Sequence, residues 1–185
     1  MILDIPKQAV VNRIIPKDRF NFEDAKKIER IRWVGKLAPN TINLPANKIQ
    51  EIEIFSVDMT DFDLNVIKEI VTKIPQEILF IVNGELGIMY YLDQFISKKV
   101  AAKLQLNGLS IDDVRDNFIR QLLDITDTSN SLKQEFETIQ LMHELESEID
   151  QINNQIKRTV QINKKQLLAR ERYALEQRLA KVKGE

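Results

Sequence analysis

The chain of 185 residues contains no cysteine, one histidine and only five glycines. Without cysteine there is no disulfide, no thiolate zinc site and no cysteine nucleophile, and this composition suits a reducing compartment. The glycines form no Gly-x-Gly-x-x-Gly string and no phosphate-binding loop, so we do not expect nucleotide binding. We interpret His143, which lies among acidic residues of a predicted helix, as a solvent-exposed side chain. We therefore expect neither a metal nor a cofactor.

Long apolar runs and a strong excess of charge are also missing. No segment approaches the roughly 18 apolar residues that cross a bilayer, and the N-terminus has neither the basic start nor the apolar stretch of a signal peptide. We expect a cytoplasmic protein with no membrane contact. The formal net charge of -1 is unlike that of a strongly cationic nucleic-acid-binding protein, whose affinity comes from clustered Lys and Arg. The net charge does not exclude a local basic patch that binds nucleic acid.

Charge is instead sorted by sign in the last third of the chain. Residues 132–150 contain one Lys and six Asp or Glu, whereas residues 151–185 contain nine Lys or Arg and three Glu. No Gly or Pro interrupts the segment before Gly184. This pattern predicts a long helical coiled-coil arm that lies against another helix.

Two apolar seams run along the predicted arm, and the second is out of phase with the first. Heptad spacing defines the first seam, which begins at Met142; the interaction residues that we predict on the two seams are Leu145, Ile149, Ile152, Ile156, Leu168, Leu175 and Leu179. The change of phase is compatible with a hairpin that turns near Thr159–Asn163, and equally with one continuous helix of about 75 Å. A hairpin would set the acidic half against the basic half.

The first part of the chain predicts a mixture of helices and strands. Pro6 and Pro16 indicate an extended lead with room for a short helix between them. Apolar residues about three apart predict an amphipathic helix over Phe22–Leu37, capped by Asn21 and stopped by Pro39. Further helices are predicted after Asp61 or Asp63, ending near Pro75, and from Ser110 to about Leu123, with Val114, Phe118 and Leu122 toward the core.

Strands are predicted where apolar residues alternate or form short runs. The predicted strands are Thr41–Leu44, Ile49–Met59, Glu77–Val82, Leu86–Leu92 and Lys98–Leu106. The Asn83-Gly84 pair marks an antiparallel hairpin between the third and fourth of them. In Ile49–Met59 the apolar positions change parity, which indicates either a bulge or a strand covered on both faces.

The predicted fold class is therefore α+β, with a small mixed or mainly antiparallel sheet, flanking helices and a long C-terminal helical coiled-coil arm. The predicted organisation is a globular domain over residues 1–125, a linker over 126–131 and the arm over 132–185.

Three groups of polar residues are candidate sites. A magnesium-dependent nuclease site needs two or three carboxylates with a Lys nearby, and the candidates for it are Glu51, Glu53, Asp58 and Lys36. An aromatic and polar cluster near a turn could bind a partner or a base, and it contains Trp33, Lys36, Asn40, Thr41 and Asn43. The basic end of the arm could contact nucleic acid through Lys157, Arg158, Lys164, Lys165, Arg170 and Arg172.

Several strings in the chain are those of a known family. They are Pro6-Lys7, Ile15-Pro16-Lys17, residues 33–44 (WVGKLAPNTINL), residues 51–55 (EIEIF), residues 106–109 (LNGL), residues 117–121 (NFIRQ) and residues 161–165 (QINKK). Together they resemble the bacterial domain-of-unknown-function family 4391. The resemblance implies an accessory component of a restriction or phage-defence system, because members tend to be encoded beside helicases and DNA methyltransferases.

We accordingly favour a non-catalytic interaction protein. Its partner would be a second copy or a larger protein, for which the resemblance alone suggests a helicase or methyltransferase. A lone helix with the first seam exposed would leave an apolar stripe in water, so something must cover it. The alternative is a metal-dependent nuclease-like or nucleic-acid-binding subunit of the same kind of system.

Overall fold

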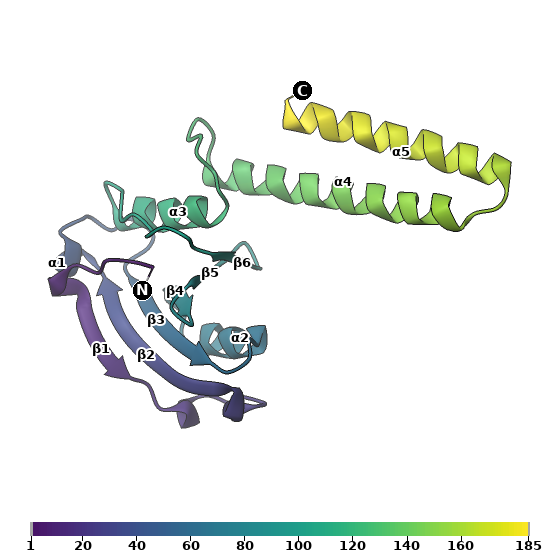
Figure 1. The fold of residues 1–185 in the computed structure, drawn as a ribbon. Helices are drawn as coiled ribbons and strands as arrows, with labels where there is room; N and C mark the ends of the chain where they lie inside the picture. Colours follow the sequence, from purple (N-terminus) through teal and green to yellow (C-terminus); the bar gives the residue numbers. More distant parts are fainter. Residues whose placement is uncertain (1, 185) are drawn as a thin grey trace. The chain divides into compact units, whose positions relative to one another are not determined.

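The computed structural model describes residues 2–184, so Met1 and Glu185, the outer ends of the two predicted domains, lie outside the described residues. The chain divides into two units, Met1–Thr126 and Asp127–Glu185. The first unit contains a six-stranded sheet and the second contains two long helices (Figure 1). This confirms the α+β fold class.

The sheet is mixed, and its strands follow chain order from β1 to β6. The strands are β1 (Val10–Ile14), β2 (Ile28–Leu37), β3 (Ile52–Met59), β4 (Glu77–Val82), β5 (Leu86–Tyr91) and β6 (Gln94–Lys99). Neighbouring strands are antiparallel except β3 and β4, which are parallel. That parallel pair requires a crossover, which α2 (Leu64–Lys73) provides.

Helices cover both faces of the sheet. On one face α2 packs Val66, Ile67 and Ile70 against inward-facing residues of the strands, among them Phe55 and Phe80. The buried residues of α3 (Ile111–Leu122) include Val114, Phe118 and Leu122, as predicted. A Cβ on Gly87 of β5 would lie 2.9 Å from Leu122 Cδ2, so a glycine at this position permits the close approach of α3 to the second face. Strand β3 is buried between the two layers, which selects the covered-strand alternative over a bulge.

Two predicted helix starts and the predicted hairpin are confirmed. Asp63 caps α2 by accepting a hydrogen bond from the Asn65 N–H, and Ser110 caps α3 by accepting one from the Asp113 N–H. β4 and β5 pair antiparallel across the turn at Asn83 and Gly84.

The predicted helix over Phe22–Leu37 is wrong, because most of that segment is strand β2, preceded by a short 3-10 helix (Ala25–Lys27). The register of β2 against β3 shifts twice, once between Ile28 and Arg30 and once between Trp33 and Gly35. Each irregularity of this kind inserts an extra residue. Ile28 and Ile31 therefore reach the same face although they are three apart, which imitates a helical pattern.

The predicted strand over Thr41–Leu44 is also wrong. Pro39 does not stop a helix there but occupies the first turn of a short one, α1 (Pro39–Ile42). Asn43 ends α1 in the left-handed conformation, with φ of 54°. Near the N-terminus, a 3-10 helix (Lys7–Ala9) does lie between the two prolines, and the edge strand β1 follows it.

The alternating segment Lys98–Leu106 is not a strand along its length. The last strand, β6, begins at Gln94 and ends at Lys99, because its partner β5 begins at Leu86, opposite Lys99. Beyond it, Leu104 forms one isolated parallel bridge with Leu3. The alternation therefore reflects burial of single side chains such as Leu104.

The second unit is a helical hairpin. It consists of α4 (Leu132–Arg158) and α5 (Ile162–Lys183), which lie antiparallel and pack along each other (Figure 1). Ser131 caps α4 in a capping box with Gln134. Thr159 ends α4, and its hydroxyl donates to the Gln155 carbonyl. Of the two arrangements left open by the sequence, the structure has the hairpin, with a turn that needs no glycine.

Candidate functional site

The apolar seams of the hairpin are partly buried. Leu145, Ile152 and Leu168 are buried, and the remaining predicted interaction residues Ile149, Ile156, Leu175 and Leu179 are half-buried. Pairing of α4 with α5 thus uses much of the surface that the sequence assigned to an outside partner. Substitution of a buried seam residue would disturb the hairpin itself.

Two polar contacts join the helices and fix their direction. Lys183 Nζ lies 2.9 Å from Glu146 Oε1, and this ion pair lowers the pKa of the Glu146 carboxyl through the hydrogen bond and charge of Lys183. Arg172 donates to Asn153 Oδ1 at 3.1 Å and also pairs with Glu176 at 3.2 Å. The ion pair joins the acidic part of α4 to the end of α5, as antiparallel packing requires.

Aliphatic side chains remain exposed at the turn of the hairpin. Val160 is 91% exposed, Ile162 73% and Leu167 66%. We call residues 157–167 the hairpin tip. The sequence pattern did not reveal these three residues, because they lie out of phase with both seams. Monomeric proteins rarely expose grouped apolar side chains without an interaction that uses them.

The hairpin tip is also strongly basic. Lys157, Arg158, Lys164 and Lys165 are exposed, and residues 157–167 contain no Asp or Glu. Arg170, one turn further along α5, is exposed as well, whereas Arg172 is engaged by Asn153 and Glu176. Five of the six predicted basic residues are therefore available to a partner.

A second polar group lies on the sheet, where β2 and β3 bring three of the four nuclease candidates together. Lys36 forms an ion pair with Glu51, and its Nζ lies 3.8 Å from Glu53 Oε1. Lys36 and Glu53 are register partners, so their side chains share one face. Asp58 is not part of this group: it pairs with Arg30 at 3.2 Å near the other end of β3.

Glu53 is unusual because its carboxylate is buried. Its side chain is 8% exposed, and Oε2 has no hydrogen-bond partner among the described residues. Burial raises the pKa of Glu53, and the charge of Lys36 only partly opposes this effect. The hydrogen bond that Lys36 donates to the Glu51 carboxylate raises the pKa of Lys36, so the lysine stays charged. We call Lys36, Glu51 and Glu53 the carboxylate–lysine cluster.

Side chains of the predicted aromatic and polar cluster form hydrogen bonds mainly with backbone groups. Trp33 Nε1 donates to the Gly35 carbonyl at 3.0 Å. The Thr41 hydroxyl accepts from the Ala38 N–H and donates to the Lys36 carbonyl, both at 2.8 Å. Asn40 and Asn43 are exposed in and after α1, and Asn43 supplies the left-handed residue. These contacts hold the end of β2 against α1.

Two kinds of feature are absent from the described residues. Within residues 2–184, no three His, Cys, Asp or Glu side chains are grouped so that they could hold a metal ion. In the same range, no helix combines the length and apolar character needed to cross a membrane.

The sheet and its helices define the N-terminal unit as an α+β domain to which a helical hairpin is joined. The profile of a family described as Domain of unknown function (DUF4391) matches residues 3–94, which run from the lead before β1 to the start of β6. These residues belong to that family, and the strings at 106–109, 117–121 and 161–165, which also carried the resemblance, lie outside the matched range. No curated protein and no solved structure matches the chain.

Proposed function

We propose that the protein is a non-catalytic interaction protein that self-associates through its hairpin. In this arrangement, the tip of one copy lies against the acidic half of α4 in a second copy. The observation that supports the proposal is the exposure of Val160, Ile162 and Leu167 within a group of four cations.

Charge complementarity favours this occupant. The half of α4 before Gln151 has a net charge of -5, and Glu137, Glu144, Glu148 and Asp150 on it are exposed. The 27 residues of α4 span about 40 Å, so two hairpins side by side and antiparallel can each place a tip at the acidic end of the other. The two contacts are then identical, and the pair closes with twofold symmetry.

The aliphatic residues favour a protein over nucleic acid as the partner. Transferring an aliphatic side chain from water to an interface stabilises a complex by about 1.5–3 kcal/mol. Contacts to phosphates would use the cations and leave Val160, Ile162 and Leu167 in water. A nucleic-acid partner would also show a steep dependence of affinity on salt, with affinity supplied by the cations alone.

Light scattering on the purified full-length protein tests the proposal. We expect the native protein to have the mass of two copies, and the double variant Ile162→Ser/Leu167→Ser to have the mass of one. Both side chains are exposed, so the hairpin itself should keep its helicity by circular dichroism. A native protein that stays a single copy up to high micromolar concentration would contradict self-association.

The family resemblance extends the proposal to a cellular setting. We suggest an accessory component of a bacterial restriction or phage-defence system in the cytoplasm, which would join a helicase or methyltransferase once assembled. Co-purification of such an enzyme with the native protein, and its loss with the Ile162→Ser/Leu167→Ser variant, is the expected result. Unchanged co-purification would remove the hairpin tip from this role.

A metal-dependent nuclease-like activity is the second candidate, and one observation favours it. Glu53 has an unpaired carboxylate oxygen beside Glu51 and Lys36, and Mg²⁺ can bind through only one or two carboxylates together with substrate phosphates. Calorimetric titration of the full-length protein with Mn²⁺ or Mg²⁺ tests it. Binding that disappears in Glu53→Ala would support the activity, whereas no heat of binding in the native protein would end it.

A further inference from the structure

The two edges of the sheet differ in regularity. In β1 the register shifts between Val10 and Arg13, and Asn12 between them has φ of 53°. Irregularities of this kind protect an edge strand from further pairing. In contrast, β6 pairs with β5 through six consecutive residues without a shift.

The outer edge of β6 presents free backbone groups. The Val100 N–H donates to the Glu85 carbonyl at 2.9 Å, which makes these two residues a hydrogen-bonded pair. Because such pairs alternate along an antiparallel ladder, the backbone groups of Phe95, Ser97 and Lys99 point away from β5. Within residues 2–184, no strand pairs with this edge.

The side chains of the same three residues face the α2 side of the sheet. Phe95 and Ser97 are register partners of Tyr90 and Ile88, and Ile88 belongs to the core under α2. A strand added to the edge of β6 would therefore place alternate side chains beside Phe95, on the side of the sheet that α2 occupies.

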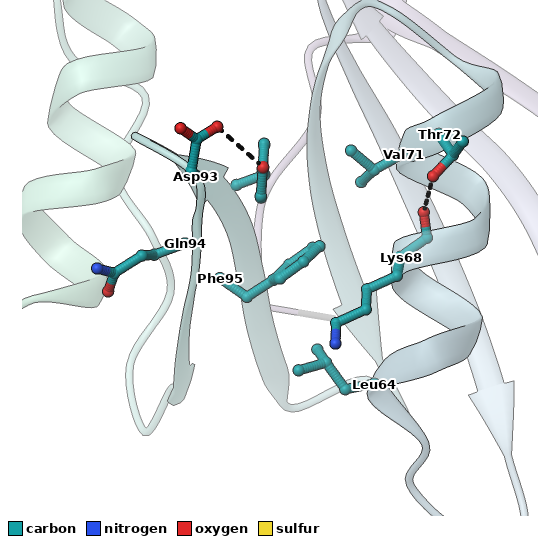
Figure 2. A pocket seen from close by; sticks show the side chains of 8 residues that line it. Leu64, Lys68, Val71, Thr72, Asp93, Gln94 and Phe95 are labelled. Atoms are coloured by element: carbon teal, nitrogen blue, oxygen red, sulfur yellow. Dashed lines mark hydrogen bonds between the residues drawn. The ribbon is translucent and has the colours of Figure 1, made fainter.

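The surface beside Phe95 contains a groove. A cavity of about 730 Å³ lies between α2 and the turn that joins β5 to β6 (Figure 2). Leu64, Lys68 and Val71 line it from one face of the helix, and Tyr90 and Phe95 line it from the sheet, with ring centroids 4.8 Å apart. Its size is that of a small-ligand or side-chain pocket.

Lys68 gives the groove a free positive charge. Its side chain extends from α2 into the groove (Figure 2), and its ammonium group forms no ion pair among the described residues. The one carboxylate that lines the groove, Asp93, accepts a hydrogen bond from the Tyr90 hydroxyl at 3.2 Å. Lys99 adds a second exposed cation at the strand edge, where it pairs with Glu85.

From these features we propose that β6 binds an extended peptide segment of another protein as a seventh strand. The peptide has apolar side chains at alternate positions, which enter the groove beside Phe95, and an acidic side chain that meets Lys68. Charge argues against a second copy of β6 as the occupant, because pairing two such edges would bring further lysines to the same junction. This site is built from residues of the sheet domain alone.

A random dodecapeptide library displayed on phage, selected on the immobilised full-length protein, supplies the probe. We expect selected peptides to share alternating apolar residues and at least one acidic residue. With a selected peptide bound, amide hydrogen exchange should slow at Phe95, Ser97 and Lys99, whose N–H groups point outward, more than at Ile96 and Lys98.

Matched variants test the contacts by fluorescence anisotropy of the labelled peptide. Lys68→Glu should weaken binding about five- to tenfold, since it replaces an attraction by a repulsion, whereas Lys73→Glu on the same helix should have no effect. Ser97→Pro removes one outward N–H and should abolish binding, and Ser97→Ala, which keeps that N–H, should bind normally.

Other outcomes would overturn the proposal. These are a selection that yields no peptide, peptides that bind equally to Lys68→Glu, and uniform exchange protection along β6. If Ser97→Pro instead lowers the mass of the native assembly, β6 is an interface between copies. The hairpin variant Ile162→Ser/Leu167→Ser should bind the peptide normally. Loss of peptide binding therefore tests the β6 site, and loss of the two-copy mass tests the hairpin tip.

Discussion

Replacing Glu53 by Gln should stabilise the protein at neutral pH. The carboxylate is 8% exposed and its Oε2 is unpartnered, so the charged form is poorly solvated. A buried polar group without a partner costs about 1–3 kcal/mol and a charged one costs more, so the neutral amide of Gln, although also unpartnered, avoids the additional cost of the charge. Lys36 keeps its closer partner Glu51 in the variant, so no charge is left unpaired. We expect a gain of about 1 kcal/mol, the low end of that range, because Lys36 offsets part of the cost.

The gain should depend on pH. Burial raises the folded-state pKa of Glu53 above its unfolded value, so ionisation favours the unfolded state. The native protein therefore loses stability relative to Glu53→Gln as the pH rises from the unfolded pKa, about 4.3, toward the raised folded value. Below that window the Glu53 carboxyl is protonated in both the folded and the unfolded state, so the two proteins should have similar stability.

Urea unfolding followed by fluorescence of Trp33, the single tryptophan, measures both effects. Series at several pH values between about 4 and 7 give the free energy of unfolding of each protein. Glu51→Gln is the control, since it removes the close ion pair with Lys36 and should not stabilise. A Glu53→Gln protein that is less stable than the native protein, by the same amount at every pH, would refute the reasoning.

Two further substitutions test the packing. Ile152→Ala, at a side chain 7% exposed, should lower the stability of the hairpin by about 2–4 kcal/mol in thermal circular dichroism, whereas Val160→Ala, at a side chain 91% exposed, should change little. Asp112→Asn should cost about 1 kcal/mol at pH 7. Burial works against the Asp112 charge, but backbone N–H groups of Asn47, Lys48 and Ile49 outweigh it and lower its pKa. The loss should therefore be present above the unfolded pKa and vanish as the pH falls through the folded one; a loss unchanged at low pH would contradict this.

The sequence predicted those elements whose signals are local. Asp63, Ser110 and the Asn83-Gly84 turn act within a few residues of themselves, and the predicted structures are present. Strand β2 could not be predicted, because its irregularities are defined by pairing with β3, which lies further along the chain. Strand β6 was not predicted because the turn before it lacks the usual sequence signal. Leu92 and Asp93 have positive φ in this turn, where Gly or Asn would normally mark a hairpin.

The candidate sites show the same limit. Spacing predicted the seam residues of the hairpin but could not tell whether an outside helix or α5 would cover them. The exposed Val160, Ile162 and Leu167 belong to no periodic pattern, so only the hairpin turn reveals them. Glu51, Glu53 and Lys36 were chosen for their chemistry, and the register of β2 and β3 explains why they meet while Asp58 does not.

A charge exchange between copies tests the central claim most directly. One variant makes the tip acidic, with a net charge of -4 (Lys157→Glu/Arg158→Glu/Lys164→Glu/Lys165→Glu), and the other makes the α4 half basic, with a net charge of +3 (Glu137→Lys/Glu144→Lys/Glu148→Lys/Asp150→Lys). We predict that light scattering finds single copies of each variant alone, because like charges meet in both, and pairs when the two are mixed, because both contacts then join opposite charges. Single copies in the mixture, or pairs of the acidic-tip variant alone, would contradict association of the tip with the acidic half of α4.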